Sequence, residues 1–268
     1  MNTQINENKN LPLEDLQTIG LYKDGNLNIS SQNIEALLAG RRTELISLES
    51  IDIDGMQIQK LEAKLSINQD SHGATYLQIH PIYNQPQIHP LLTTQESNAL
   101  INGEKNVIRK LHKSKDENII PINIEYDNET KEFVSYDPSR IPEIHQVNGI
   151  TISKSQQEDF RRGDLVELHD GTKFQHSATD SQGILSDRKR LIFSILLDGG
   201  LSYLIFRELK NLRNSNNKQS EGLSKAYNES LSKLILADKD DQQKDKTVSD
   251  YHNEMNSHHE NLNSKNRR

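Results

Sequence analysis

A recurrence at about 60 residues is the feature that most constrains how this chain folds. Gly40, Gly103 and Gly163 lie 63 and 60 residues apart, and the residue types that precede them recur. An apolar residue stands eleven positions before each glycine, Ser or Thr ten before, and Leu or Phe three before. These positions are Ile29, Leu92 and Ile152; Ser30, Thr93 and Ser153; and Leu37, Leu100 and Phe160. Such a period is typical of stacked or arrayed structural units.

Each recurring residue type has a physical role in a short helix. The Ser or Thr hydroxyl accepts an otherwise unpaired backbone N–H and so caps the helix N-terminus. The apolar residue before it can pack onto the first turns. The Leu or Phe would face the core, and the glycine ends the helix in the left-handed conformation. The pattern predicts three two-turn helices and a duplicated unit. The alternative is chance, because capped helices that end in Gly are common.

Strand-like alternation follows each glycine. The expected strands are residues 45–53, 61–67 and 76–83 in the first unit, 107–111, 120–126 and 133–136 in the second, and 165–168 and the run through Phe174 in the third. Asp54-Gly55 and Asp170-Gly171 separate alternating runs, which is a strong hairpin signal. The sequence thus predicts an α+β fold. It would consist of three repeated units, each a short helix plus an antiparallel β-hairpin, followed by a helical C-terminal segment and a disordered tail.

Residues 191–209 form the most apolar stretch. A membrane span needs roughly 20 predominantly apolar residues, and here Asp198, Gly199 and Gly200 interrupt the run. A charge at the centre of a bilayer is costly. We therefore predict two short packed helices with a Gly-Gly break and no membrane span. This pair would cover the third hairpin or form a homo-oligomer contact through residues 191–206.

The low apolar content predicts that part of the chain is not packed. Hydrophobic residues make up 32% of the chain, and the mean hydropathy is −0.80. We expect disorder at residues 1–10 and 239–268. The expected divisions are 11–90, 91–145 and 146–212 for the three units, the third with the apolar helical pair, and 213–268 for a polar tail with an amphipathic helix at 220–238. The apolar face of that helix would carry Leu223, Tyr227, Leu231, Leu234 and Ile235.

Composition also bears on compartment and on partners. The chain has no cysteine, which fits a reducing compartment. The first ten residues lack an apolar segment, so no secretory signal is visible, and we expect a cytoplasmic protein. Residues 1–150 carry 13 Lys and Arg against 21 Asp and Glu, a formal charge of −8. Proteins that grip duplex DNA usually carry a basic surplus, so direct DNA binding through this half is disfavoured.

No set of residues is assigned to catalysis, to a cofactor or to a metal. His169-Asp170 is similar to a metal-dependent phosphohydrolase dyad, but its position between two strands favours a turn. His176, Thr179, Asp180, Asp187 and Asp198 could offer ligands to a hard divalent cation. Their irregular spacing favours solvated loop residues. The sequence contains neither a phosphate-binding glycine loop nor a Ser–His–Asp order with a nucleophile elbow.

Clusters of cations are the candidate partner contacts. Two Arg pairs fall at predicted helix C-termini, where they could offset the helix dipole or contact a phosphate or an acidic partner. The possible partner contacts are Arg41, Arg42, Arg161, Arg162, His169, Arg188, Lys189 and Arg190. The glycines predicted to have structural roles are Gly40, Gly103, Gly163, Gly171, Gly199 and Gly200.

Two segments carry a resemblance to known families. Residues 33–43, Asn33-Ile34-Glu35-Ala36-Leu37-Leu38-Ala39-Gly40-Arg41-Arg42-Thr43, resemble an uncharacterised domain family common in Bacteroidetes. The third unit resembles the usual companion of that family. The matching residues are Gln156-Gln157, Phe160-Arg161-Arg162-Gly163, Leu168-His169-Asp170-Gly171-Thr172 and Leu197-Asp198-Gly199-Gly200-Leu201-Ser202-Tyr203-Leu204. The resemblance covers roughly residues 11–212.

The resemblance implies a cellular context but no catalytic residues. Proteins of these families resemble cargo of conjugative and other mobile elements, and related segments occur fused to topoisomerase-like proteins. This implies an accessory role in DNA processing or conjugative transfer. Our leading hypothesis is a non-enzymatic binding or adaptor protein whose partner is a protein or a nucleic-acid-processing complex. The alternatives are a metal-dependent nuclease or phosphohydrolase that uses His169, Asp170, His176 and Asp180, and a structural oligomerisation module.

Overall fold

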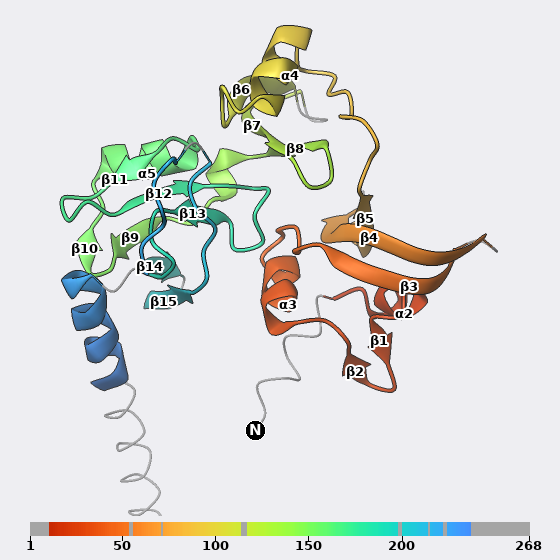
Figure 1. Ribbon diagram of the computed structural model, residues 1–268, viewed down its shortest axis with the longest axis horizontal. Helices are drawn as coiled ribbons and strands as arrows, with labels where there is room; N and C mark the ends of the chain where they lie inside the picture. Colours follow the sequence, from red (N-terminus) through yellow and green to blue (C-terminus); the bar gives the residue numbers. More distant parts are fainter. Residues whose placement is uncertain are drawn as a thin grey trace, which may run out of the picture.

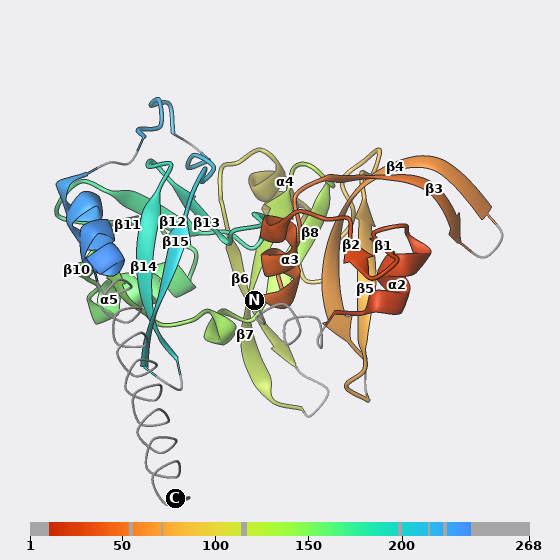
Figure 2. The same cartoon turned by 90° about the horizontal axis from the view of Figure 1, so that it is seen from below.

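The protein is a row of three α+β units followed by a helix. The computed structural model describes residues 11–53, 56–70, 72–113, 117–197, 200–213, 215–221 and 224–236. Figure 2 shows the units in sequence order across the molecule, and in Figure 1 the second unit lies above the first and the third. The first and third units also contact each other directly, for example where Arg41 donates to the Ser181 carbonyl. The mixed α+β class expected from the sequence is confirmed, with several small antiparallel sheets.

The first unit begins with a helix and a small hairpin before its repeated part. Its elements are α2 (Leu13–Thr18), β1 (Tyr22–Lys23), β2 (Asn26–Leu27), α3 (Ser31–Leu38), β3 (Ile46–Ile53), β4 (Met56–Gln69) and β5 (Thr75–Pro81). Strands β3, β4 and β5 form an antiparallel meander. Alternate residues of β4, including Ala63 and Leu65, are buried in the core of this unit with Leu37 of α3. The predicted Asp54-Gly55 turn lies outside the described residues.

The second unit has the same order of a helix and three antiparallel strands. Its elements are α4 (Thr94–Ile101), β6 (Ile108–Lys113), β7 (Ile119–Asp127), β8 (Glu132–Tyr136) and the 3-10 helix η2 (Pro138–Arg140). Its own core gathers Leu100 of α4 with Ile124 and Tyr126 of β7. A turn between Asp127 and Glu132 joins β7 to β8.

The third unit contains more strands than predicted. Its elements are β9 (Ile144–Val147), β10 (Ile150–Thr151), α5 (Lys154–Arg161), β11 (Val166–Glu167), β12 (Lys173–His176), β13 (Ile184–Ser186), β14 (Leu191–Leu197) and β15 (Gly200–Phe206). Two sheets form it, β11-β12-β13 and β10-β9-β14-β15. Because β9 includes residue 145, the expected division between the second and third units falls inside a strand. The Asp170-Gly171 turn is confirmed, since Asp170 accepts the Thr172 N–H at 3.0 Å.

The predicted apolar helical pair is wrong. Strands β14 and β15 pair antiparallel along their whole length, from Leu191 opposite Phe206 to Leu197 opposite Gly200. Seven-residue runs rich in Ile, Leu and Phe suit buried strands as well as helices, and length favours strands. The residues between them, Asp198 and Gly199, lie outside the described part of the chain.

The three expected helices and their caps are confirmed. Ser30, Thr93 and Ser153 each accept a backbone N–H from three residues further on, and the latter two also complete capping boxes. The glycine after each helix has a positive φ of 68–74°. At Gly163 a Cβ would also stand 2.6 Å from Val107 Cγ2, so the close contact between the second and third units requires glycine there. The common origin of the three units stays a prediction.

A further α-helix follows the third unit at residues 225–236. Its Tyr227 is buried, and its Ser230 lies against Gly149 in the turn between β9 and β10. The predicted apolar face is only partly covered, because Ile235 is exposed. Leu223 and the two predicted disordered segments lie outside the described residues. No helix within the described part of the chain has the length and apolar character to cross a bilayer.

Candidate functional site

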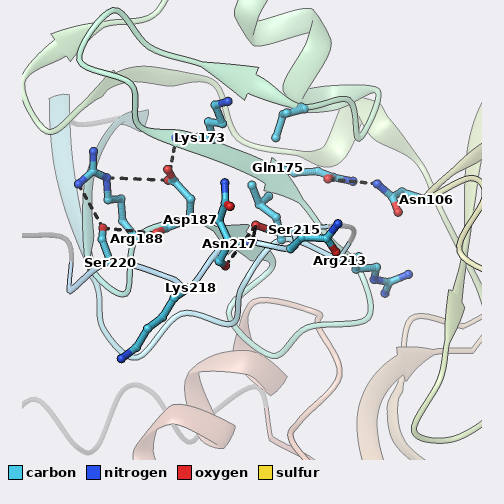
Figure 3. A pocket seen from close by; sticks show the side chains of 13 residues that line it. Asn106, Lys173, Gln175, Asp187, Arg188, Arg213, Ser215, Asn217, Lys218 and Ser220 are labelled. Carbon is cyan, nitrogen blue, oxygen red and sulfur yellow. Dashed lines mark hydrogen bonds and ion pairs between the residues drawn. The ribbon is translucent and has the colours of Figure 1, made fainter.

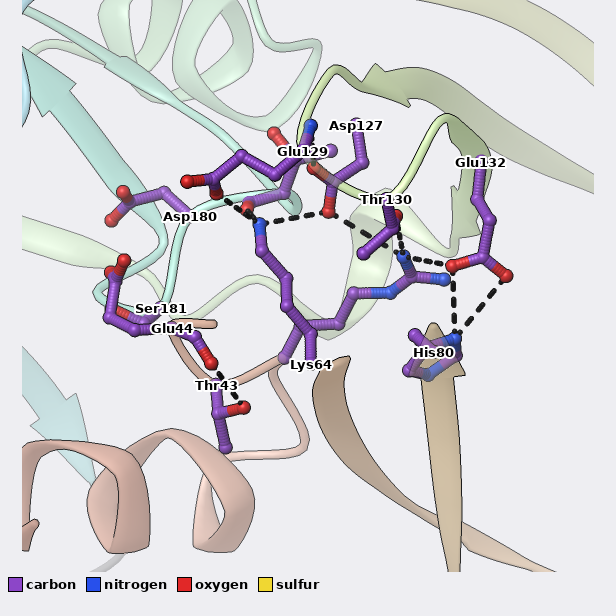
Figure 4. A network of polar contacts seen from close by, with 12 residues as sticks. Thr43, Glu44, Lys64, His80, Asp127, Glu129, Thr130, Glu132, Asp180 and Ser181 are labelled. Atoms are coloured by element: carbon purple, nitrogen blue, oxygen red, sulfur yellow. Dashed lines mark hydrogen bonds and ion pairs between the residues drawn. The ribbon is translucent and has the colours of Figure 1, made fainter. Parts of the chain in front are cut away.

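The three units have separate apolar cores, and an ion-pair network joins them. The network is buried at Lys64, Arg42 and Asp127 and partly exposed at Lys210. We call the network around Lys64, Arg42 and Lys210 the junction. Figure 4 shows the part of it around Lys64, Asp127 and Glu132. The Lys64 side chain on β4 is only 1% exposed, and its Nζ lies 2.9 Å from Asp127 Oδ2 and 2.7 Å from Glu129 Oε2. The same Nζ donates to the Thr179 carbonyl at 2.9 Å. One ammonium group of the first unit therefore binds the second and third units together.

Arg42 adds a second link between the first two units. Its Nη1 lies 2.9 Å from Glu132 Oε2 and 3.5 Å from Asp127 Oδ2. His80 of β5 contacts Glu132 at 3.2 Å and shares a 2.9 Å hydrogen bond with Ser66. Burial alone would raise the pKa of Glu132, but the His80 hydrogen bond and the Arg42 charge outweigh burial and lower it. Glu132 is therefore a stable anion within the fold.

Lys210, which follows β15, closes the junction on the side of the third unit. Its Nζ lies 2.8 Å from Glu44, 3.5 Å from Asp180 and 3.7 Å from Glu129. Burial opposes its charge, but the Glu44 hydrogen bond and the nearby carboxylates outweigh burial and raise the pKa of Lys210. Burial raises the pKa of Asp180, and Lys210 offsets only part of that effect.

A buried carboxylate lies between the second and third units. Glu125 of β7 accepts hydrogen bonds from the Tyr136 hydroxyl at 2.8 Å, the Ser177 hydroxyl at 3.0 Å and the Ala178 N–H at 3.1 Å. Burial raises the pKa of Glu125 despite these donors. His176 lies 3.8 Å from Glu125, and burial and the Arg41 charge lower its pKa to about 4.

A cavity of about 550 Å³ opens beside this carboxylate, between the β11-β12-β13 sheet and the chain that follows β15 (Figure 3). We call it the basic cavity. It is lined by Asn106, Leu165, Lys173, Gln175, Asp187, Arg188, Leu212, Arg213, Ser215, Asn216, Asn217, Lys218 and Ser220. Four lining residues are cationic and one is acidic. The charge of this lining is thus opposite in sign to that of the whole chain, which is −7.

The cations of the basic cavity have long intrachain ion pairs. Lys173 lies 3.3 Å from Glu167, Arg188 lies 3.9 Å from Asp187 and Arg213 lies 4.0 Å from Glu125. Lys218 has no ion pair within the described part of the chain. The Asp187 carboxylate also accepts the Lys173 backbone N–H at 2.9 Å. Arg213 also donates to the Tyr126 carbonyl at 3.1 Å and to the Thr179 hydroxyl, so its guanidinium is held by the fold. Arg188 and Lys218 therefore carry most of the positive charge that is available to an anion from outside the chain.

The predicted partner contacts are dispersed over three places. Arg188 lines the basic cavity, and the neighbouring Lys189 pairs with Glu221 at 2.7 Å on the outside. Arg190 directly precedes β14. Arg41 and Arg42 lie at the junction, where Arg41 donates to the Ser181 carbonyl at 2.8 Å. Arg161 and Arg162 lie at the end of α5 beside their own Glu158 and Asp159, and His169 is exposed at the β11–β12 turn.

The residues of the metal-enzyme alternative do not form a common site. His169 and Asp170 occupy the β11–β12 turn, His176 lies in the aromatic core contact with Phe160 and Tyr136, and Asp180 lies at the junction. Among the described residues, no three His, Asp or Glu side chains are grouped so as to hold a metal ion. The metal-dependent hydrolase hypothesis thus has no ligand set in this part of the chain.

Sequence reasoning missed Lys64, Asp127, Lys210 and Arg213. Lys64 stands in the outward-facing register of β4, between the buried Ala63 and Leu65, where a charged residue is normally solvated. Only the approach of the second and third units covers it. The polar loop at residues 211–220 carried no periodic pattern, and yet it forms one wall of the basic cavity.

Comparison with known proteins identifies one family match. Residues 6–91 match the family described as "Protein of unknown function (DUF4099)". This stretch contains α2 to β5 and ends before the Thr93 cap of α4. No curated protein and no solved structure matches the chain.

Proposed function

We propose that this protein is a non-catalytic binding or adaptor module that holds an acidic partner at the basic cavity. The observation that carries the proposal is the concentration of Lys173, Arg188, Arg213 and Lys218 around one opening of a chain that is acidic overall. Clefts lined by one sign of charge focus the field and attract ligands of the opposite sign. The junction holds the second and third units, which form the walls, in a fixed relation.

The scaffold role follows from the buried ion pairs. Charges out of water are retained when their geometry and hydrogen bonding are good, and such groups can specify one arrangement of the parts around them. Lys64 meets this condition with three oxygen partners at 2.7–2.9 Å. We propose that the three units are copies of one ancestral unit and that this junction evolved to hold them as a single body.

The resemblance of the first and third units supports a cellular context. We propose that the protein is cytoplasmic, that it is encoded on a mobile element of Bacteroidetes, and that its partner belongs to DNA-processing or conjugative-transfer machinery. The acidic front half favours a protein partner over direct contact with duplex DNA.

The test measures binding of two defined polyanions to the full chain by fluorescence anisotropy at 150 mM salt. The probes are labelled poly-L-glutamate and a labelled 20-base-pair DNA duplex. The cavity variant is Arg188→Gln with Lys218→Gln. The matched control is Lys60→Gln with Lys225→Gln, which removes the same charge at exposed positions that do not line the cavity.

We expect poly-L-glutamate to bind more tightly than the duplex. The cavity variant should lose at least about tenfold in affinity for it, and the control less than about twofold. Equal losses in the two variants would show that net charge, not the cavity, attracts the probe. Failure of both probes to bind the wild-type chain would refute the proposal.

A second candidate function is self-association through β15. This strand is at the edge of its sheet, and Tyr203, Leu204 and Ile205 are 49%, 41% and 42% exposed. Long apolar edge strands can pair with another chain. If this strand is an interface, Leu204→Asp converts an oligomer to a monomer in light scattering, whereas Lys225→Asp does not. A wild-type monomer at micromolar concentration eliminates this candidate.

A further inference from the structure

The basic cavity has two ends of different chemistry. Figure 3 shows Arg188 and Ser220 at one end and Asn106 beside Gln175 at the other, with Asn217 and Ser215 between them. The first end offers positive charge, and the second offers side-chain amides. A ligand that fills the cavity must therefore match both ends.

Asn106 presents an acceptor that the chain does not satisfy. Gln175 Nε2 donates to the Gly163 carbonyl at 3.0 Å, so Gln175 Oε1 faces Asn106 and accepts from Asn106 Nδ2 at 3.4 Å. This arrangement fixes the Asn106 amide and leaves its Oδ1 buried without a hydrogen-bond partner. Buried acceptors without partners are rare and costly. A ligand at this end is therefore expected to supply an N–H or O–H donor.

Arg188 presents unused donors at the opposite end. Its Nη1 donates to Ser220 Oγ at 3.1 Å, and its Nε is buried without a hydrogen-bond partner, 3.9 Å from Asp187. A guanidinium carries five N–H donors in a plane that matches phosphate oxygens. Lys218, in the chain that follows β15, also lines the cavity and adds a second charge. This end suits a phosphate group.

The cavity also supplies apolar surface and a fitting size. Leu165 and Leu212 both line it, and Leu165 is 50% exposed. The volume of about 550 Å³ falls within the usual range of roughly 300–1,000 Å³ for small-molecule sites. A flat ring that carries N–H donors on its edge fits such a wall.

We propose that the basic cavity binds one nucleotide unit, with the phosphate at Arg188 and Lys218 and a base donor at Asn106 Oδ1. This inference goes beyond the proposed function, because the occupant is a nucleotide and not an acidic protein, and it rests on the proposed attraction of anions to the basic cavity. The nucleotide can be a free nucleoside monophosphate or the 5′-terminal residue of a single strand, because both present the same phosphate and base. An inorganic phosphate or a carboxylate supplies the anion alone and leaves Asn106 unpaired.

The test is isothermal titration of the full chain with a matched set of probes. These are AMP, GMP, CMP, UMP, adenosine, inorganic phosphate, a 5′-phosphorylated four-base DNA strand and a tetraglutamate peptide. The variants are Arg188→Gln, Asn106→Leu and Leu165→Ala, and the control is Asn84→Leu at an exposed position. Circular dichroism checks that each variant is folded, and the half-exposed Leu165 provides a variant with little risk to the fold.

We expect at least one nucleotide to bind at least tenfold more tightly than inorganic phosphate. Asn106→Leu and Leu165→Ala should lower the affinity for that nucleotide at least fivefold and leave the affinity for phosphate unchanged. Arg188→Gln should lower both affinities. Tighter binding of the phosphorylated strand than of the mononucleotide assigns the site to a strand end, and the reverse assigns it to a free nucleotide.

Two outcomes overturn the inference and separate it from the proposed function. If phosphate or tetraglutamate binds as tightly as every nucleotide, and only Arg188→Gln has an effect, the cavity is a general anion site and only the nucleotide assignment fails. If no anionic probe binds the wild-type chain at millimolar concentration, both fail.

Discussion

The junction and the basic cavity both contain cationic side chains, but the chain neutralises those charges to different degrees. At the junction the shortest ion pairs of Lys64, Arg42 and Lys210 measure 2.7, 2.9 and 2.8 Å. At the cavity the corresponding distances are 3.3 Å for Lys173 and 3.9 Å for Arg188, and Lys218 has no ion pair in the described part of the chain.

This difference distinguishes structural from functional charge within one chain. A charge that is buried and paired at short distance stabilises the native arrangement, and removing one partner leaves an uncompensated ion. A charge with long or no intrachain pairs contributes little to stability and can neutralise a ligand. The two regions therefore predict opposite responses to substitution, and the predictions below proceed from the largest to the smallest effect.

The largest expected effect follows removal of the Lys64 charge. Lys64→Met should lower the free energy of unfolding by roughly 3–5 kcal/mol, because Asp127 remains buried and loses its closest cation. Urea denaturation followed by circular dichroism measures this. Adding Asp127→Leu should recover part of the loss, since the pair is then replaced by apolar groups. A loss below 1 kcal/mol in the single variant would mean that the junction does not stabilise the native arrangement of the units.

The next effect concerns His176, which lies between the two regions. Its folded pKa of about 4 is below the ordinary 6.5, so between these values the unfolded chain binds a proton that the fold excludes. Its contribution is fully present above pH 6.5 and is lost as the pH falls toward 4, by about 3 kcal/mol at most. Urea titrations from pH 7 to pH 4 should show this extra loss in the wild type relative to His176→Phe.

Glu125 affects the pH dependence of stability in the opposite direction to His176, so its contribution must be separated from that of His176. Burial raises its folded pKa, so its protonation favours the fold as the pH falls. Both proteins retain Glu125, and the difference between them therefore isolates His176. Parallel pH profiles for the wild type and His176→Phe would contradict the assignment of a buried neutral imidazole.

A smaller effect is expected at the helix caps. It provides the stability loss of a local contact, with which the loss at the junction can be compared. Thr93→Ala should cost about 1 kcal/mol, because it leaves the Glu96 N–H without its acceptor. Urea denaturation measures the loss, and Thr93→Ser should restore most of it. A cost as large as that of Lys64→Met would mean that local helix ends, not the contacts between units, limit the stability.

The cap result also shows which parts of the fold the sequence could predict. Ser30, Thr93 and Ser153 were identifiable because capping acts within three residues. Strand alternation and the Asp170-Gly171 turn are equally local. The helix prediction for β14 and β15 failed because continuous apolar runs carry no period that separates helix from strand.

The junction could not be predicted, because its partners are far apart in the sequence. Lys64 and Asp127 are 63 residues apart, and Lys64 and Thr179 are 115 apart. Of the basic cavity, only Arg188 was singled out as a partner contact, through its place in a run of cations. The sequence did not single out Asn106, because the orientation of its amide depends on a hydrogen bond to Gln175, which belongs to another unit.

The smallest expected effect on stability is at Lys218. It tests whether a cation of the basic cavity, unlike those of the junction, can be removed without loss of stability. This side chain is exposed and has no ion pair in the described part of the chain. Lys218→Ala should therefore change the free energy of unfolding by no more than about 0.5 kcal/mol. In the same preparation it should weaken anion binding severalfold, because an exposed Lys that stabilises nothing in the chain keeps its charge for a ligand. Paired urea and binding titrations measure both quantities. A variant that lost stability and kept its affinity would place Lys218 among the structural charges and remove the distinction between the two regions.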